Sequence, residues 1–89
     1  MQTRETTIIN KLGLHARAAA KFVTLASTYA SDIQLKTDSR QVNGKSIMGV
    51  LMLAAAKGTV LNITTEGPDE ESAMTGLVEL IENRFDEEE

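Results

Sequence analysis

Seven short segments with the patterns of strands and helices follow one another along this chain, and no linker, repeat or low-complexity stretch separates them. Residues 32–37 alternate apolar and polar side chains, which predicts a half-buried strand. Residues 16–28 instead place Phe22 and Ala26 at helical spacing, which predicts a helix. With 89 residues, the chain has room for one domain over residues 1–89 and one modest core. We therefore expect the segments to pack on one another.

The segments occur in the order βαββαβα. The predicted strands cover residues 3–9, 32–37, 40–43 and 59–66, and the predicted helices cover residues 16–28, residues 46–53 and a third segment that starts within 67–71. The apolar stripe of the third helix is formed by Ala73, Leu77, Leu80, Ile81 and Phe85. This order predicts an α+β fold with one four-stranded, largely antiparallel sheet and the helices on one face. The pattern leaves the strand order open, because a ferredoxin-like sheet has nearly the same sequence of elements.

Composition narrows the class of protein. The chain has no cysteine, which excludes a disulfide framework and thiolate catalysis, and its single histidine argues against a structural zinc site, so we expect no metal. The net charge of −4 disfavours binding to nucleic acid. The first residues lack the apolar core of a signal peptide, and the longest apolar run, 47–56, falls short of the roughly 20 residues that a membrane span needs. We expect a cytoplasmic domain with no membrane insertion, and residues 86–89 as a frayed acidic tail.

The one histidine, His15, lies where a turn opens into a helix. Gly13 permits the turn, and the alanine-rich segment that starts at Ala16 favours a helix. His15 is therefore at or next to the N-cap, where backbone N–H groups have no partner within the helix and the dipole favours an anion. A neutral imidazole there, with Arg17 close by, suits the transfer of a phosphoryl group. Position alone leaves a histidine that merely caps the helix as an alternative.

Two segments of the chain resemble a known family. The run Gly13 to Arg17 (GLHAR) resembles the active-site segment of the HPr family, the histidine phosphocarriers of the bacterial phosphoenolpyruvate-dependent phosphotransferase system. The run Asn43 to Leu51 (NGKSIMGVL) resembles the regulatory-serine region of that family, at the expected distance from the histidine. The resemblance extends from Thr3 to about Phe85. One position departs from it, because Ala18 stands where the family commonly has proline.

The resemblance implies an open-faced β-sandwich with strand order 1-4-2-3 and three helices on one face. It implies a phosphocarrier, not an independent enzyme, that accepts a phosphoryl group from enzyme I on Nδ1 of His15 and passes it to IIA proteins or domains in sugar uptake and its regulation. The backbone N–H groups of Ala16 and Arg17 and the Arg17 guanidinium would stabilise the phosphate. No cofactor is implied, and we expect a monomer. The nitrogen-regulatory paralogue shares these motifs and stays an alternative.

Ser46 and the helix that follows it are the second region of interest. Ser46 precedes an apolar helical run, which predicts that it caps this helix. In some lineages of the family the matching serine is phosphorylated by a dedicated kinase, HPr kinase/phosphorylase, so the resemblance implies a regulatory phosphorylation site. The helix is apolar nearly all round and cannot bury every side chain. We expect Ile47, Met48 and Leu51 to form an exposed patch beside His15 that docks partners.

Two other classes of function stay open from the residues alone. An acylphosphatase-like hydrolase would need a phosphate-cradling loop, and the nearest candidate, residues 44–46, lacks the upstream glycine and the strand of a P-loop. A non-catalytic regulatory domain would predict that His15→Ala leaves activity unchanged. We also expect a local basic zone around His15, formed by Arg17, Lys21 and Lys45, to steer an acidic partner surface toward the site.

Overall fold

The computed structural model describes all 89 residues, and the helices and strands appear in the predicted order. The strands are β1 (Gln2–Thr7), β2 (Asp32–Lys36), β3 (Gln41–Asn43) and β4 (Val60–Glu66), and the helices are α1 (Ala16–Ala26), α2 (Ile47–Met52) and α3 (Glu70–Glu82). A short 3₁₀ turn, η1 (Arg84–Asp86), follows α3 and was not predicted. The segments that were predicted with both ends agree with the observed bounds to within two residues.

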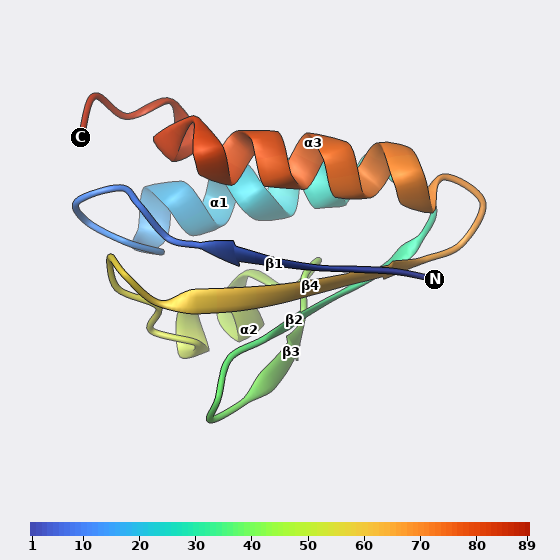
Figure 1. The fold of residues 1–89 in the computed structure, drawn as a ribbon, viewed down its shortest axis with the longest axis horizontal. Coiled ribbons are helices and arrows are strands. Elements are labelled where there is room, and N and C mark those ends of the chain that lie inside the picture. Colours follow the sequence, from blue (N-terminus) through green and yellow to red (C-terminus); the bar gives the residue numbers. More distant parts are fainter.

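The four strands form one antiparallel sheet in the order β1-β4-β2-β3, which confirms the order implied by the family resemblance. β4 pairs with β1 on one side and with β2 on the other, and β3 adds to the free edge of β2. Figure 1 shows α1 and α3 side by side along the sheet, while α2 packs against α1 and β3. The chain directions in Figure 1 make α1 and α3 antiparallel.

Alternation along the strands separates an apolar face of the sheet from a polar one. Leu61 and Ile63 of β4 and Leu35 of β2 are completely buried. They belong to a single cluster of 19 buried residues, to which the helices contribute Ala18, Ala19, Phe22, Ala26, Val50, Ala73, Met74, Leu77, Val78 and Ile81. The opposite face carries no helix and presents polar side chains, among them Gln34, Asn62 and Thr64. The fold is therefore the expected open-faced β-sandwich.

The loop between β1 and α1, which carries the histidine, is pressed against the loop that precedes β4. The backbone N–H of Leu14 donates to the carbonyl oxygen of Ala55 over 2.8 Å. Gly13 has a φ of +66°, and a Cβ atom built there would lie 2.5 Å from the same Ala55 oxygen. Both the backbone conformation and the available space therefore require glycine two residues before His15.

The end of α3 differs from the prediction. The helix stops at Glu82, and Arg84, Phe85 and Asp86 follow with φ angles of 57°, 54° and 64°, in the left-handed region that non-glycine residues rarely adopt. Phe85 is completely buried, but it lies in this turn and not on the stripe of α3. The prediction that placed Phe85 on the third helix is wrong, because the chain turns left-handed after Asn83.

Residues 86–89, the acidic end of the chain, contact the β1–α1 loop in the structure. After the left-handed turn the chain continues past the end of α3 and ends near the β1–α1 loop, as Figure 1 shows. The backbone N–H of Lys11 donates to the carbonyl oxygen of Glu89, and the Lys11 ammonium lies 3.3 Å from the Glu89 carboxylate. The segment thus has defined contacts in the structure, and these bring its acidic side chains to the start of α1.

We expect Gly13→Ala to destabilise the fold more than Gly58→Ala. Both glycines have positive φ, but nothing lies within 4 Å of a Cβ atom built at Gly58. Both substitutions carry a left-handed backbone cost of about 1–2 kcal/mol, and overpacking against Ala55 adds about 1–3 kcal/mol at Gly13 alone. Urea unfolding of the two variants measures the difference. Equal losses of unfolding free energy would show that the close approach to Ala55 does not constrain the loop.

Candidate functional site

The helix α1 begins at the histidine. His15 is the N-cap, with an extended backbone at φ −74° and ψ 179°, which confirms the predicted position. Its carbonyl oxygen accepts the first helical hydrogen bond, from the N–H of Ala19 over 2.8 Å. The N–H groups of Ala16, Arg17 and Ala18 donate to no group of the chain, and the imidazole makes no capping bond. Three unpaired donors and the positive end of the helix dipole therefore lie next to the ring.

A carboxylate from the other end of the chain faces the imidazole. Oε2 of Glu87 lies 2.5 Å from Nε2 of His15, and only 13% of the Glu87 side chain is exposed. This hydrogen bond is the largest influence on the Glu87 carboxyl and lowers its pKa, against the opposing effect of burial. The Asn10 amide and the charges of His15 and Arg17 lower the pKa further. Glu87 is therefore ionised near neutral pH.

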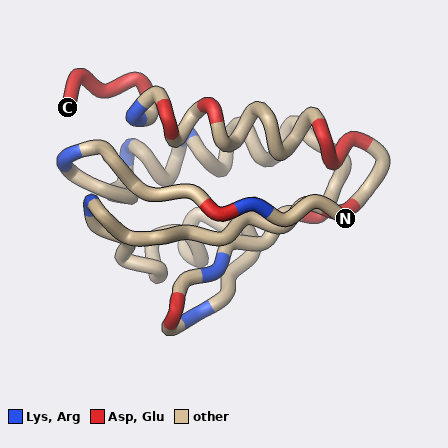
Figure 2. Tube along the Cα trace, in the orientation of Figure 1, with Lys and Arg blue, Asp and Glu red and all other residues tan.

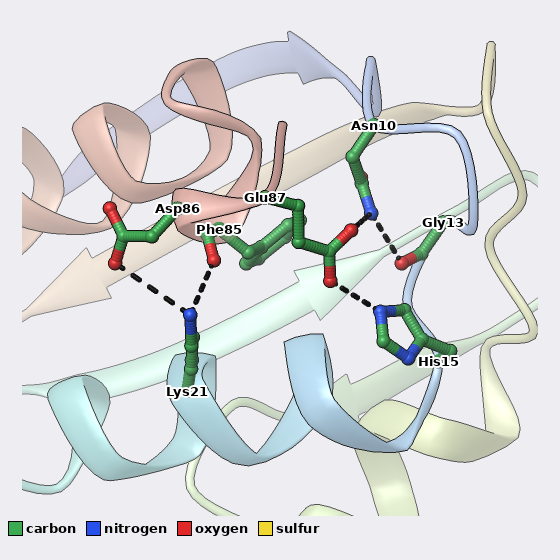
Figure 3. Close-up of polar contacts among 7 residues, drawn as sticks. All are labelled: Asn10, Gly13, His15, Lys21, Phe85, Asp86 and Glu87. Atoms are coloured by element: carbon green, nitrogen blue, oxygen red, sulfur yellow. Dashed lines mark hydrogen bonds and ion pairs between the residues drawn. The ribbon is translucent and has the colours of Figure 1, made fainter. Parts of the chain in front are cut away.

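One side chain holds Glu87 directly and another holds the turn just before it, as Figure 3 shows. The buried Asn10 donates through Nδ2 to the carbonyl oxygen of Gly13 over 2.8 Å and to Oε1 of Glu87 over 3.0 Å. Lys21 of α1 donates through Nζ to the carbonyl oxygen of Phe85 over 2.8 Å. The turn that carries Glu87 is thus tied both to the β1–α1 loop and to α1.

The predicted basic zone is smaller than expected. Arg17 is exposed and lines a shallow hollow beside the histidine together with Lys21. Lys45 does not line this hollow, because its ammonium donates instead to the carbonyl oxygen of Tyr29 over 2.7 Å. The prediction that included Lys45 is therefore wrong. Figure 2 shows basic positions at this end of the molecule beside the acidic C-terminal segment.

Ser46 is the N-cap of α2, as predicted. Its Oγ accepts a hydrogen bond from the N–H of Gly49 over 3.1 Å. Of the side chains expected in the apolar patch, Ile47 is 42% exposed and Met48 is 65% exposed. Leu51 is half-buried and packs against the core, so it contributes only part of its surface. The patch lies on the helix that packs against α1, which begins at the histidine.

Sequence reasoning missed Asn10 and Glu87. Glu87 lies 72 positions from His15 and stands within a run of like charges, so no local pattern distinguishes it from its neighbours. Asn10 is one polar residue after two apolar ones. The only signal was Phe85, because a large aromatic residue just before an acidic tail indicates that the chain end is anchored in the core.

The site offers an imidazole, backbone N–H groups, a guanidinium and a carboxylate. No three His, Cys, Asp or Glu side chains converge in an arrangement that could hold a metal ion. None of the helices has both the length and the apolar character that crossing a membrane would require.

The sequence places this site in a class of phosphoryl-carrying proteins. The sequence model described as "PTS HPr component phosphorylation site" matches residues 2–83. The chain is 58% identical over 88 residues to the phosphocarrier protein HPr of Pseudomonas aeruginosa, and the match covers 98% of each chain. These matches define a phosphocarrier. The chain belongs to the HPr family of the phosphotransferase system.

Solved structures agree with the fold. The crystal structure of HPr-C-His from Thermoanaerobacter tengcongensis is similar to this structure with a TM-score of 0.96, at 47% identity and with all of both chains covered. The crystal structure of an HPr dimer from the same organism is similar with a TM-score of 0.79, at 47% identity, and covers 98% of this chain and 100% of that chain. The fold of this chain is thus that of known HPr proteins.

We expect the Glu87 carboxylate to make stability depend on pH. Because the pKa of Glu87 is lower in the folded protein than its ordinary value of 4.5, its stabilising contribution is complete above that value. The contribution is lost as the pH falls through the folded pKa, since the unfolded chain then binds the proton more readily. Glu87→Gln should therefore lower the unfolding free energy near neutral pH, and the loss should shrink in acid.

Urea titrations of the native protein and Glu87→Gln, in steps from about pH 6 to about pH 3, measure this loss. Glu88→Gln is the matched control, because it removes the same charge from an exposed neighbour with no hydrogen bond to the site. A loss in Glu87→Gln that stays constant over this range would contradict the expectation.

Proposed function

We propose that this chain accepts a phosphoryl group from enzyme I, itself charged by phosphoenolpyruvate, on Nδ1 of His15 and passes it to IIA proteins or domains. One observation carries the proposal. In a chain of the HPr family, the only imidazole stands at the N-cap of an 11-residue helix, beside backbone N–H groups without partners. Such a helix start favours an anion next to the ring.

The chemistry requires a neutral ring nitrogen, because an imidazolium has no lone pair to attack phosphorus. The N–H groups of Ala16 and Arg17 would then donate to the phosphoryl oxygens, and the exposed Arg17 guanidinium would add a charge-assisted contact. Ala18, where the family commonly has proline, keeps one further N–H donor at the same helix start. Transfer of this kind depends mainly on positioning and electrostatic stabilisation.

Partners would dock on the exposed surface of α2. Met48 and Ile47 would provide the main apolar contacts, because both are exposed and an unbranched methionine adapts to several partner surfaces. Leu51 would support them from beneath, since it packs against the core. Arg17 and Lys21 would meet acidic groups of the partner near the histidine.

We place the carrier in the cytoplasm, as a monomer in the sugar-uptake branch and its regulation, with Ser46 open to HPr kinase/phosphorylase where the host has that enzyme. The nitrogen-regulatory branch is the alternative. Parallel assays with the enzyme I of each branch distinguish the two, because the correct partner should phosphorylate the chain much faster. Size-exclusion chromatography tests the monomer.

His15→Ala should abolish phosphorylation by enzyme I and phosphoenolpyruvate while the fold remains. The native chain should gain one phosphoryl group that is labile in acid and stable in alkali, as expected for a phosphorus–nitrogen bond. Ser46→Ala is the control and should keep this label. Mass spectrometry and circular dichroism measure phosphate and fold, and an acid-labile label on His15→Ala would show that another residue is the acceptor.

Ser46→Asp should slow the transfer without unfolding the protein. Asp is also a favourable N-cap, so the free energy of unfolding should stay within about 1 kcal/mol of the native value. The new carboxylate would lie next to the exposed Ile47 and Met48, where it would repel an acidic partner. We expect transfer from enzyme I to fall roughly tenfold, which corresponds to about 1.4 kcal/mol of docking free energy.

The cause of the slower transfer can be separated from a loss of stability. Ser46→Ala removes the cap and should lower the free energy of unfolding by about 0.5–2 kcal/mol without the added charge. It should therefore keep the native transfer rate at a temperature where it is folded. Melting temperatures and transfer rates are measured on the same samples. A native transfer rate in Ser46→Asp would contradict this role of Ser46.

A further inference from the structure

The two ring nitrogens of His15 have different surroundings. Nε2 faces the carboxylate of Glu87 at 2.5 Å. Nδ1 has no hydrogen-bond partner in the chain, and Figure 3 shows it directed away from Glu87. A neutral imidazole carries one proton, on either nitrogen, and the partners of the ring decide which nitrogen holds it.

An ionised carboxylate only accepts hydrogen bonds. Both oxygens of Glu87 are engaged, Oε1 by the Asn10 amide and Oε2 by the ring. The low pKa of Glu87 keeps it ionised, so Nε2 must be the nitrogen that carries the proton. The lone pair of the neutral ring then lies on Nδ1.

We propose that Glu87 is a positioning residue for His15, whose carboxylate holds the proton on Nε2 and so leaves the lone pair of Nδ1 available as the nucleophile. The part of this inference that concerns transfer rests on the proposed function. Its physical basis is a common one in proteins, where a carboxylate that accepts from one imidazole nitrogen fixes the tautomer and raises the basicity of the other nitrogen.

The group-transfer step balances with this assignment. The Nδ1 lone pair forms the bond to phosphorus, and the bond between phosphorus and the donor's phosphorylated nitrogen breaks, its electron pair leaving with the donor. No proton needs to move, since Nε2 keeps its hydrogen throughout. The ring gains positive character as the new bond forms, and the adjacent Glu87 carboxylate compensates this charge.

Glu87 does not block the site that the phosphoryl group would use. It makes no hydrogen bond to the N–H groups of Ala16 or Arg17 or to the Arg17 guanidinium. Its contacts lie on the Nε2 edge of the ring. Glu87 is therefore placed to orient the ring and not to compete with the incoming phosphate.

The buried amide of Asn10 determines how a glutamine at position 87 would be oriented. Its Nδ2 uses both protons, on the Gly13 carbonyl and on Glu87, while its Oδ1 is buried without a partner. In Glu87→Gln, the new amide would turn its oxygen toward Asn10, because two NH₂ groups cannot face each other. Its own NH₂ would then donate to Nε2, which forces the proton onto Nδ1.

The experiment measures the His15 tautomer by ¹⁵N NMR at a pH where the ring is neutral. The native protein should have its proton mainly on Nε2, and Glu87→Gln should shift the population toward Nδ1. Glu87→Ala, which leaves the ring to water, should fall between them. Glu88→Gln, with the same charge loss at an exposed residue, should match the native protein. Circular dichroism establishes that each variant is folded.

Phosphoryl acceptance from phosphorylated enzyme I is measured on the same samples. We expect a roughly tenfold slower rate in Glu87→Gln and the native rate in Glu88→Gln. An unchanged tautomer in Glu87→Gln, or a native protein with its proton on Nδ1, would overturn the proposal. An unchanged rate despite a shifted tautomer would also overturn it, and a faster rate would make Glu87 an inhibitory contact.

The role of Glu87 and the proposed phosphocarrier function can fail independently of each other. If the native chain accepted no phosphate from enzyme I, the phosphocarrier role would fail. The NMR measurement would still decide whether Glu87 sets the tautomer, because it needs no partner protein.

Discussion

The antiparallel packing of α1 against α3 on the single apolar face of the sheet determines the rest of the structure. Because the sheet is buried on one side only, both long helices must lie on that side, and Phe22 and Leu77 enter the same core there. Antiparallel packing places the N-terminus of α1 and the C-terminus of α3 at one end of the molecule. That end carries His15 at the helix start and the turn with Glu87 opposite it.

This arrangement also pairs opposite electrostatic features. The start of α1 is positive, through its free N–H groups and its dipole, and the end of α3 is negative, through its carbonyl groups and the acidic residues that follow. Lys21 of α1 makes one such contact, since its ammonium binds the Phe85 carbonyl oxygen just beyond α3. An incoming anion would therefore meet donors at α1 while the carboxylate of Glu87 stays on the far edge of the ring.

The periodicity of the sequence was sufficient to predict the helices and strands and part of the site. The alternation through Ile33 and Leu35 predicted β2, and the position of His15 after Gly13 predicted the start of α1. The strand order needed the family resemblance, because pairing between distant strands leaves no local signal. The role of Glu87 could not be predicted for the same reason, since its contact with the histidine spans 72 positions. Lys45 shows the converse error, because the sequence does not reveal that its ammonium binds the Tyr29 carbonyl oxygen.

The left-handed turn that leads to Glu87 depends on contacts with other parts of the molecule. Each non-glycine residue in that conformation costs about 1–2 kcal/mol, so the turn at Arg84–Asp86 needs compensation from outside itself. Complete burial of Phe85 and the hydrogen bond from Lys21 supply it, and both contacts belong to α1 or to the shared core. Loss of either contact would weaken the anchoring of the turn that precedes Glu87. The contact between Glu87 and the histidine is in this way linked to the packing of the last helix, although no residue of α3 itself makes a hydrogen bond to the ring.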